Sequence, residues 1–262
     1  MTKVQVEDQV DHESSDTPPS SPGTGRRLHG SVAHTLGTAI LSGEYAPGHT
    51  FSGEIEFSKT LHVSRTTYRE AIQVLIGKGL VETRPKIGTR ILPRSRWNLL
   101  DPDVLAWSCA DGPDIDFIHN LFELRAIVEP AAAAFAALRR DRSDLKAMKD
   151  SLAGMRRHTL ATEAGRTADR DFHAAILHAT RNDALIVLST GVGVAVGWTT
   201  QFKQYAPGLP RNSISDHVRV YDEIAAGDPA RASGAMRTLV ELALQDTKLA
   251  MAHRLHPAPH DS

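Results

Sequence analysis

The most regular hydrophobic pattern in the chain lies between residues 64 and 77. Apolar side chains recur there every three or four positions, which places them on one face of a helix. These side chains are Tyr68, Ala71, Ile72, Leu75 and Ile76. Ser64 stands where a hydroxyl can cap the first turn, so the pattern predicts a helix that begins next to Ser64 and ends near Gly77.

The segments around this helix complete a recognisable unit. Weaker periodic patterns predict two helices before it, over residues 31–41 and 53–61. After it, residues 80–84 and 89–92 alternate between apolar and polar side chains, and a Pro-Lys-Ile-Gly turn separates them, which is typical of a hairpin. Three helices followed by a hairpin predict a winged helix-turn-helix domain.

The second half of the chain shows only helical periodicity, without the alternation of a strand. The predicted helices span residues 114–139, 143–160, 162–180, 183–201, 213–226 and 229–255. Glycines at 191, 193 and 197 predict a kink or close packing in the fourth of them. The fold class is therefore mainly α: an N-terminal winged helix-turn-helix and a C-terminal all-α antiparallel helical bundle.

A length of 262 residues favours two domains. Residues 1–25 are polar and acidic and are predicted to form a disordered tail. The winged helix-turn-helix then occupies residues 26–94, a linker occupies 95–112, and the helical bundle occupies 113–255.

General features favour a cytoplasmic protein without a membrane partner. No run of about 18 apolar residues is apparent, and the N-terminus lacks an apolar signal core. Cys109 is the single cysteine, so an intramolecular disulfide is impossible and a reducing compartment fits. We expect this thiol to be a packing residue rather than a reactive group.

Charge is unevenly distributed, although the net charge is only -1. Residues 26–97 hold eleven Lys and Arg side chains against five Asp and Glu, whereas the first 25 residues are acidic. A basic block within a slightly acidic protein is typical of a module that binds a polyanion. With the helix order and the hairpin, it favours double-stranded DNA as the partner over an ordinary charged surface.

The predicted DNA contacts come from the third helix and the hairpin. A helix in the major groove reads base edges with the outward side chains of its first turns. A hairpin wing meets phosphates or the minor groove. The candidate DNA-binding residues are Arg65, Thr66 and Arg69 on the helix, and Lys86, Gly88 and Arg90 on the wing.

Three polar residues fall on apolar helix faces in the second half. Asp169 and His173 are four residues apart and project from one side of a helix, while His217 lies in the apolar stripe of another. A carboxylate and two imidazoles that converge can hold a divalent metal such as zinc. Each residue alone is also compatible with a buried side chain that only satisfies its hydrogen bonds.

Two other residues are candidates for contact with a small acidic ligand. The Arg125 guanidinium can clamp a carboxylate through two hydrogen bonds, or it can pair with Glu129 four residues later. Asn182 can bind ligand hydroxyls or cap the helix that follows it.

A DNA-binding half and a ligand-binding half together favour a regulator, but two other functions stay open at this point. Asp169, His173 and His217 could serve a metal-dependent hydrolytic enzyme with an open metal position. No carboxylate is obviously placed as a general base, however, and a basic winged domain would then be unexplained. A DNA-binding architectural protein would not need to bury these polar side chains.

The N-terminal motifs resemble those of the GntR family of bacterial regulators. The resemblance rests on residues 43–48, on Val-Ser-Arg-Thr and Arg-Glu-Ala within residues 63–71, and on Gly79-Leu80-Val81 with Gly88. It covers residues 28–92 and implies a homodimer that binds operator DNA. Many members carry an arginine where this chain has Ile55, so contacts from the third helix are expected to matter more here.

The second half resembles the effector-binding and dimerisation domain of the FadR branch of that family, called FCD. The resemblance covers residues 115–250, on Glu123-Leu124-Arg125, Glu129-Pro130, residues 169–173, Asn182, Asp216-His217 and Gly227-Asp228. It implies an aspartate and three histidines that bind a metal, which helps to hold a carboxylate effector.

Asp169, His173 and His217 match three of these four ligands, but the fourth position falls at Leu239, which cannot coordinate. The resemblance therefore implies either a three-ligand site that effector or water completes, or a metal-free pocket. It further implies that Arg125, with the three ligand residues, binds the effector, and Asn182 stays a candidate for the same role.

Residues 97–107 resemble the linker of galactonate-type repressors in this branch. This resemblance implies a repressor that a sugar acid (an aldonate) or a related small carboxylate releases from its operator.

Overall fold

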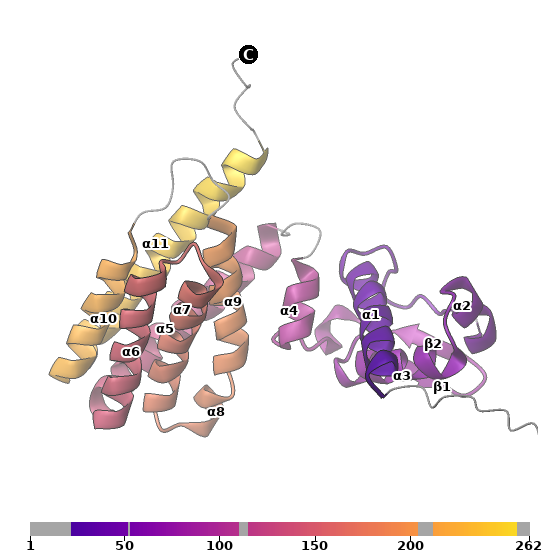
Figure 1. Ribbon diagram of the computed structural model, residues 1–262, viewed down its shortest axis with the longest axis horizontal. Coiled ribbons are helices and arrows are strands. Elements are labelled where there is room, and N and C mark those ends of the chain that lie inside the picture. Colours follow the sequence, from indigo (N-terminus) through magenta and orange to yellow (C-terminus); the bar gives the residue numbers. More distant parts are fainter. Residues whose placement is uncertain (1–21, 52, 110–114, 204–211, 256–262) are drawn as a thin grey trace, which may run out of the picture.

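The computed structural model describes residues 22–51, 53–109, 115–203 and 212–255 (Figure 1). Three helices and a hairpin form one lobe, seven further helices form a second lobe, and one short helix, α4, lies between the two. The predicted fold class, a winged helix-turn-helix and a helical bundle, is confirmed. Residues 1–21 of the predicted tail lie outside the described residues.

The first lobe contains the three predicted helices: α1 (Pro22–Leu41), α2 (Glu54–Thr60) and α3 (Arg65–Gly77). The predicted start of the first helix was wrong, because α1 begins at Pro22 rather than at residue 31 and includes four residues assigned to the tail. Proline suits a first helical turn, whose N–H groups have no partner in the helix.

The hairpin is also present, as strands β1 (Val81–Arg84) and β2 (Gly88–Ile91). They pair antiparallel with Val81 opposite Ile91. Lys86 in the turn and Gly88 directly after it adopt φ angles of 64° and 95°, both in the left-handed region. Glycine enters this region at no cost.

The apolar stripe of α3 builds the core of this lobe, as its period predicts. Four of its five members are buried, against Leu36 and Ile40 of α1 and two stacked aromatic rings, Phe51 and Phe57. Burial of these side chains fixes the rotation of α3 on the domain, and with it the direction in which its polar face points.

The second lobe is an antiparallel bundle. Its helices are α5 (Ile115–Arg139), α6 (Arg142–His158), α7 (Glu163–Ala179), α8 (Asp183–Ile186), α9 (Ser189–Lys203), α10 (Ile214–Ala226) and α11 (Pro229–Leu255). α5 packs along α11, α7 packs between α6 and α9, and α10 packs on α11. Phe122, Phe172, Met148 and Met155 fill the interior.

The single helix predicted over residues 183–201 is wrong, because the chain breaks after Ile186 and divides it into α8 and α9. Two of the three glycines in α9 serve close packing. A Cβ on Gly191 would lie 3.1 Å from the Leu100 carbonyl oxygen, and one on Gly197 would lie 2.8 Å from a nitrogen of Arg170.

The linker contains a helix that the hydrophobic pattern did not predict, α4 (Pro102–Ser108), preceded by a short 3₁₀ turn, η1 (Arg94–Arg96). Asp101 caps α4 by accepting hydrogen bonds from the backbone of Asp103 and Val104. The Asp-Pro pair at its start is the cap signal that also opens α11, but seven residues are too few to show a period.

The two faces of α4 belong to different cores. Val104 and Trp107 join the core of the first lobe, whereas Leu105 packs with Phe117, Leu121 and Ala195 of the bundle. Buried Lys78, at the end of α3, binds Asp101 and Asp103 at 2.7 Å each and so ties α3 to α4.

One window of the described residues, Asp183–Thr200, is long and apolar enough to cross a membrane by length and composition, with a mean hydropathy of 1.3. The expectation that no such stretch exists was therefore wrong. The window includes the break between α8 and α9, and 44% of it is buried inside the protein, as in the core helix of a bundle.

Gly37 is where α1 approaches α4 most closely. A Cβ at this position would lie 2.3 Å from the Trp107 ring. We expect Gly37→Ala to destabilise the protein by about 1–3 kcal/mol relative to Gly30→Ala, because the ring must move. Gly30 lies in the same helix with open space around it, so both variants gain the same helix propensity. Urea unfolding of both checks this; equal stability would contradict the packing.

Candidate DNA-binding surface and buried ligand site

The first turns of α3 present the predicted base-contacting side chains to solvent. Ser64 caps the helix, and its hydroxyl accepts a hydrogen bond from the backbone N–H of Thr67. Arg65, Thr66 and Arg69 are all exposed. The structure therefore brings these three residues together on one accessible face.

Glu54 at the start of α2 organises this face, and sequence reasoning missed it. Its two carboxylate oxygens lie 3.4 Å from Arg65 Nε and 2.8 Å from Arg69 Nε. The hydrogen bond from Arg69 and the charges of both arginines lower the pKa of the Glu54 carboxyl. Nothing in the period of α2 indicated this contact, because it depends on the angle between α2 and α3.

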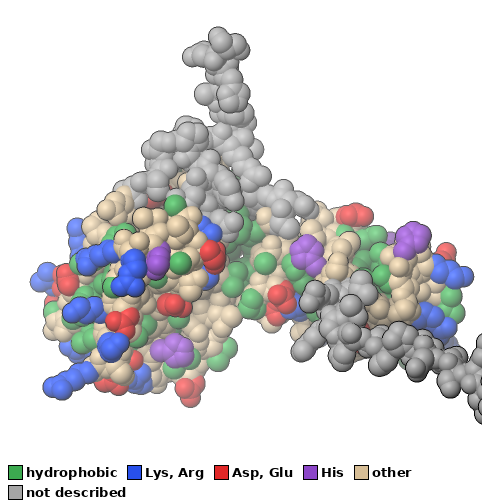
Figure 2. Space-filling view, viewed as in Figure 1, with side chains coloured by type: hydrophobic (Ala, Val, Ile, Leu, Met, Phe, Trp, Pro, Cys, Tyr) green, Lys and Arg blue, Asp and Glu red, His purple; other side chains and the backbone are tan. Residues whose placement is uncertain are grey.

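The hairpin supplies the other predicted contacts. Lys86 and Arg90 are exposed, and Arg90 stands opposite Glu82 in the register of the strands. A Cβ on Gly88, the first residue of β2, would lie 3.4 Å from the Phe51 carbonyl oxygen, so the chain offers only backbone at this position. Figure 2 shows Lys and Arg side chains at the end of this lobe farthest from the bundle, where Figure 1 places α2 and the hairpin.

The structure also brings together the three residues predicted to bind a metal. Asp169 and His173 of α7 meet His217 of α10 in the bundle core, and all three are buried. Asp169 Oδ1 lies 3.0 Å from His217 Nε2 and 3.7 Å from His173 Nε2. The three ligand atoms lie within 4.8 Å of one another.

Each imidazole has an oxygen behind it. His217 Nδ1 lies 2.8 Å from the backbone oxygen of Ser213, and His173 Nδ1 lies 2.6 Å from Glu129 Oε2. Oxygen acceptors behind metal-binding histidines fix the ring orientation and the tautomer. Both rings thus turn Nε2 toward Asp169.

The hydrogen bonding of His217 fits a cation at this point. A carbonyl oxygen can only accept, so Nδ1 of His217 carries a proton and Nε2 is the ring atom that faces Asp169 Oδ1. Both of these atoms are buried, and neither has another hydrogen-bond partner among the described residues. A buried carboxylate oxygen 3.0 Å from an imidazole nitrogen needs a positive charge, which either a proton on Nε2 or a metal ion bound to both atoms supplies. The donor set therefore fits a divalent metal ion.

Charge within the cluster keeps both carboxylates ionised. Burial alone raises the pKa of Glu129, but the Arg125 guanidinium and His173 hold it at about 2. Burial likewise acts against Asp169, yet His217, His173 and a hydrogen bond from Thr200 keep its pKa well below the ordinary range. Asp169 is thus available as an anionic ligand.

The other two predicted effector contacts differ in their placement. Arg125 is buried and donates to Glu129 at 2.6 Å, which is the ion pair considered from the sequence, and it also lines the small cavity beside the cluster. Asn182 caps α8 by accepting from the backbone N–H of Ala184. Asn182 is not among the residues that line that cavity.

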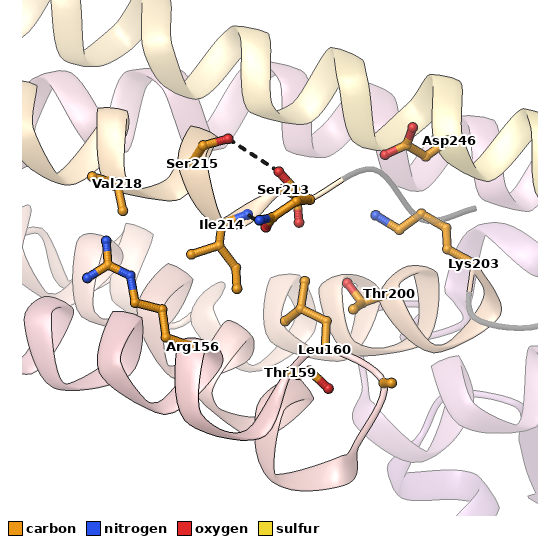
Figure 3. Close-up of a pocket in the computed structure, with 12 residues that line it drawn as sticks. Arg156, Thr159, Leu160, Thr200, Lys203, Ser213, Ile214, Ser215, Val218 and Asp246 are labelled. Atoms are coloured by element: carbon orange, nitrogen blue, oxygen red, sulfur yellow. Dashed lines mark hydrogen bonds between the residues drawn. The ribbon is translucent and has the colours of Figure 1, made fainter. Parts of the chain in front are cut away.

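Two adjoining cavities open at the cluster. The inner one, of about 10 Å³, is bounded by the three ligand residues, Arg125 and Leu239. The outer one, of about 810 Å³, lies among α6, α9, α10 and α11 (Figure 3). Thr200, Lys203 and Ser213 line both, so they form the neck between them. Sequence reasoning missed these three, although a lysine near the end of an apolar helix was a visible signal.

Comparison with known families finds two matches along the chain. Residues 28–91 match the family described as bacterial regulatory proteins, gntR family, and residues 120–242 match the FCD domain. The first match covers α2, α3 and the hairpin, and the second covers the buried cluster.

Comparison with characterised proteins finds the galactonate operon transcriptional repressor of Escherichia coli. It is 33% identical over 212 residues, which is 80% of this chain and 92% of that protein. The Uxu operon transcriptional regulator of the same species is 34% identical over 167 residues, 62% of each chain. A solved structure described as Lar, which "controls the expression of the Listeria monocytogenes agr system", is 18% identical with a TM-score of 0.59, over 88% of this chain and 99% of that one; it supports the fold alone.

The buried ion pair of Arg125 with Glu129 leads to a stability prediction. We expect Glu129→Ala to lower the free energy of unfolding by about 3–5 kcal/mol, because it leaves a buried guanidinium without its anion. Asp150→Ala breaks the exposed Lys146–Asp150 pair, which has the same four-residue spacing, and should cost less than about 0.5 kcal/mol. Urea unfolding compares the two; similar losses would contradict the assigned role of burial.

Proposed function

The chain belongs to the GntR family of bacterial regulatory proteins and carries an FCD domain, and from this premise we propose that it is a repressor of sugar-acid catabolism. In this proposal a small carboxylate effector, an aldonate or a related sugar acid, releases it from its operator. The observation that carries the sensor half is the buried triad Asp169, His173 and His217, which lies beneath a cavity large enough for such a molecule.

The DNA-binding half would act as a homodimer on a short palindrome, since two symmetric recognition helices match two half-sites. Arg65, Thr66 and Arg69 would contact base edges, with Lys86, Gly88 and Arg90 at the backbone or minor groove. Glu54 would hold Arg65 and Arg69 extended before DNA arrives. The exposed Ile55 stands where many members of the family carry an arginine, so α3 would supply more of the base recognition.

The sensor half would bind one divalent metal, such as zinc, through Asp169, His173 and His217. When bound, the cation offers an open coordination position to a carboxylate oxygen of the effector. Leu239 is buried at the position of a fourth ligand and closes that side with an apolar wall. The effector or water would thus complete the coordination from the neck, where Thr200, Lys203 and Ser213 lie.

α9 gives a physical route from the effector to the DNA-binding lobe. Its C-terminal part carries Thr200 and Lys203, which line both cavities, and its N-terminal part packs through Gly191 and Ala195 on the linker. A small shift of α9 on effector binding would therefore reach α4 directly. Coupling between two such sites is typically about 1–3 kcal/mol, enough to change DNA affinity by one or two powers of ten.

An enzymatic role gains no support. The matched families and the relatives are transcription regulators, and the metal-dependent hydrolase alternative would leave the winged domain without a purpose. A repressor of this kind would act in the cytoplasm, on chromosomal DNA.

The first test is a fluorescence-anisotropy titration on DNA from upstream of the protein's own gene, followed by a panel of sugar acids and small carboxylates. We expect salt-sensitive binding that at least one sugar acid reverses. Binding that none of them changes would contradict the proposed effector class, and absence of binding to upstream DNA would contradict the repressor.

Arg65→Ala tests the reading of bases. We expect a loss of about 1–3 kcal/mol in operator binding and little change on random DNA, because a bidentate contact to a base is sequence-specific. Arg237→Ala, an exposed arginine on α11, is the matched control and should bind as wild type. If the variant bound both DNAs more weakly to the same extent, Arg65 would contact a phosphate rather than a base.

Metal content tests the triad. After dialysis against zinc and removal of excess ion, we expect about one zinc per chain in the wild type and a clear loss in His217→Ala. His178→Ala, an exposed histidine on α7, should retain the metal. A wild-type protein without metal, or a His217→Ala variant that keeps it, would refute the three-ligand site.

A further inference from the structure

The outer cavity has a cation at each end. Figure 3 shows Arg156 of α6 at one end and Lys203 of α9 at the other, with Ile214, Leu160 and Thr200 between them. Lys203 is buried, with 6% of its surface exposed, and belongs to the neck that leads to the metal cluster. Arg156 lies at the end of the outer cavity that is farther from this neck.

Arg156 is exposed and has no anionic partner among the described residues. Among the described residues it makes no ion pair or hydrogen bond to another side chain, unlike Arg166 and Arg170 of α7, which both bind Glu163. Residues 204–211, which follow α9 in the sequence, contain no Asp or Glu. An arginine that lines a cavity without an acidic partner is suited to an anionic group of a ligand.

The wall between the two cations suits a hydroxylated carbon chain. Hydroxyl and amide groups of Thr200, Ser213, Ser215 and Asn212 alternate with the apolar side chains of Ile214 and Leu160. Such a lining offers hydrogen bonds to sugar hydroxyls and apolar contact to their C–H faces. The volume of about 810 Å³ exceeds what a six-carbon acid needs.

We propose that the outer cavity binds the far end of the effector and that Arg156 binds a second anionic group there. The effector would then be a sugar acid with an anionic group at each end, one carboxylate at the metal cluster and a second carboxylate or a phosphate at Arg156. This inference rests on the proposed function, and it narrows the effector class from sugar acids in general to those with an anion at each end.

The charges of the two cavities agree with a dianion. Asp246 lines the outer cavity and balances one of its two cations, which leaves one positive charge. In the inner cavity the charges of Arg125 and Glu129 cancel. A divalent cation bound to Asp169 would therefore leave one net positive charge there. A ligand with two negative charges would neutralise both cavities, and a monocarboxylate would neutralise one.

Matched pairs of six-carbon acids test the proposal on the full-length protein. The probes are galactonate with galactarate, gluconate with glucarate, and 6-phosphogluconate, each titrated against the operator complex and against the protein alone by thermal shift. We expect at least one dianion to release DNA at a concentration tenfold or more below that of its monoanionic partner. The aldarate and phosphate arms distinguish a second carboxylate from a phosphate.

Arg156→Ala identifies the residue. It should weaken the response to the effective dianion about tenfold or more, as loss of a charged hydrogen bond does, and change the response to the monoanion less than twofold. Arg157→Ala is the control and should respond as wild type, because Arg157 is also exposed but does not line the cavity. Arg156→Lys should restore part of the preference, since it keeps the charge but loses the planar geometry.

The outcomes separate this inference from the proposed function. If an aldonate releases DNA as well as its aldarate and 6-phosphogluconate, and Arg156→Ala changes nothing, the second anion site is refuted while the repressor stands. If no sugar acid of either kind binds or releases DNA, the proposed function fails first.

Discussion

Burial of five ionisable side chains in one bundle is the constraint around which the second lobe is arranged. Arg125, Glu129, His173, Asp169 and His217 form a continuous chain in which neighbours lie 2.6–3.7 Å apart. Each ion removed from water costs several kcal/mol unless a partner of opposite charge stands at the right place. α5, α7 and α10 therefore have to keep a fixed rotation and height relative to one another.

That requirement gives the candidate site one closed side and one open side. The Glu129 and Ser213 oxygens hold the two imidazoles from behind, and Leu239 and Val196 close the inner cavity with apolar surface. The neck at Thr200, Lys203 and Ser213 is the remaining polar approach among the described residues. A molecule that enters the inner cavity through this neck would first meet groups on α9 and at the start of α10.

The sequence predicted most of what periodicity and spacing can encode. The stripe of α3, the hairpin and the pairing of Asp169 with His173 follow from local geometry, and the inward position of His217 follows from its own stripe. Contacts between elements were not predictable in the same way. Glu54 reaches Arg65 and Arg69 only because of the angle between α2 and α3, and Lys203 joins the site only because α9 packs beside α7. α4 was missed because seven residues do not complete two turns.

The position of α4 also constrains how DNA-binding and sensor domains of this kind can be recombined. Trp107 rests on Gly37 of the first lobe, Leu105 lies among residues of the bundle, and Lys78 is bound to the cap of α4. If the first lobe were exchanged at a point before α4, Trp107 would lose its contact with Gly37 of α1. If the exchange point lay after α4, Leu105 would lose its contacts with the bundle. A winged domain grafted onto a different sensor would therefore need compensating substitutions on one of the two faces of this helix, and the lineage of the linker should be traced with both domains rather than with either alone.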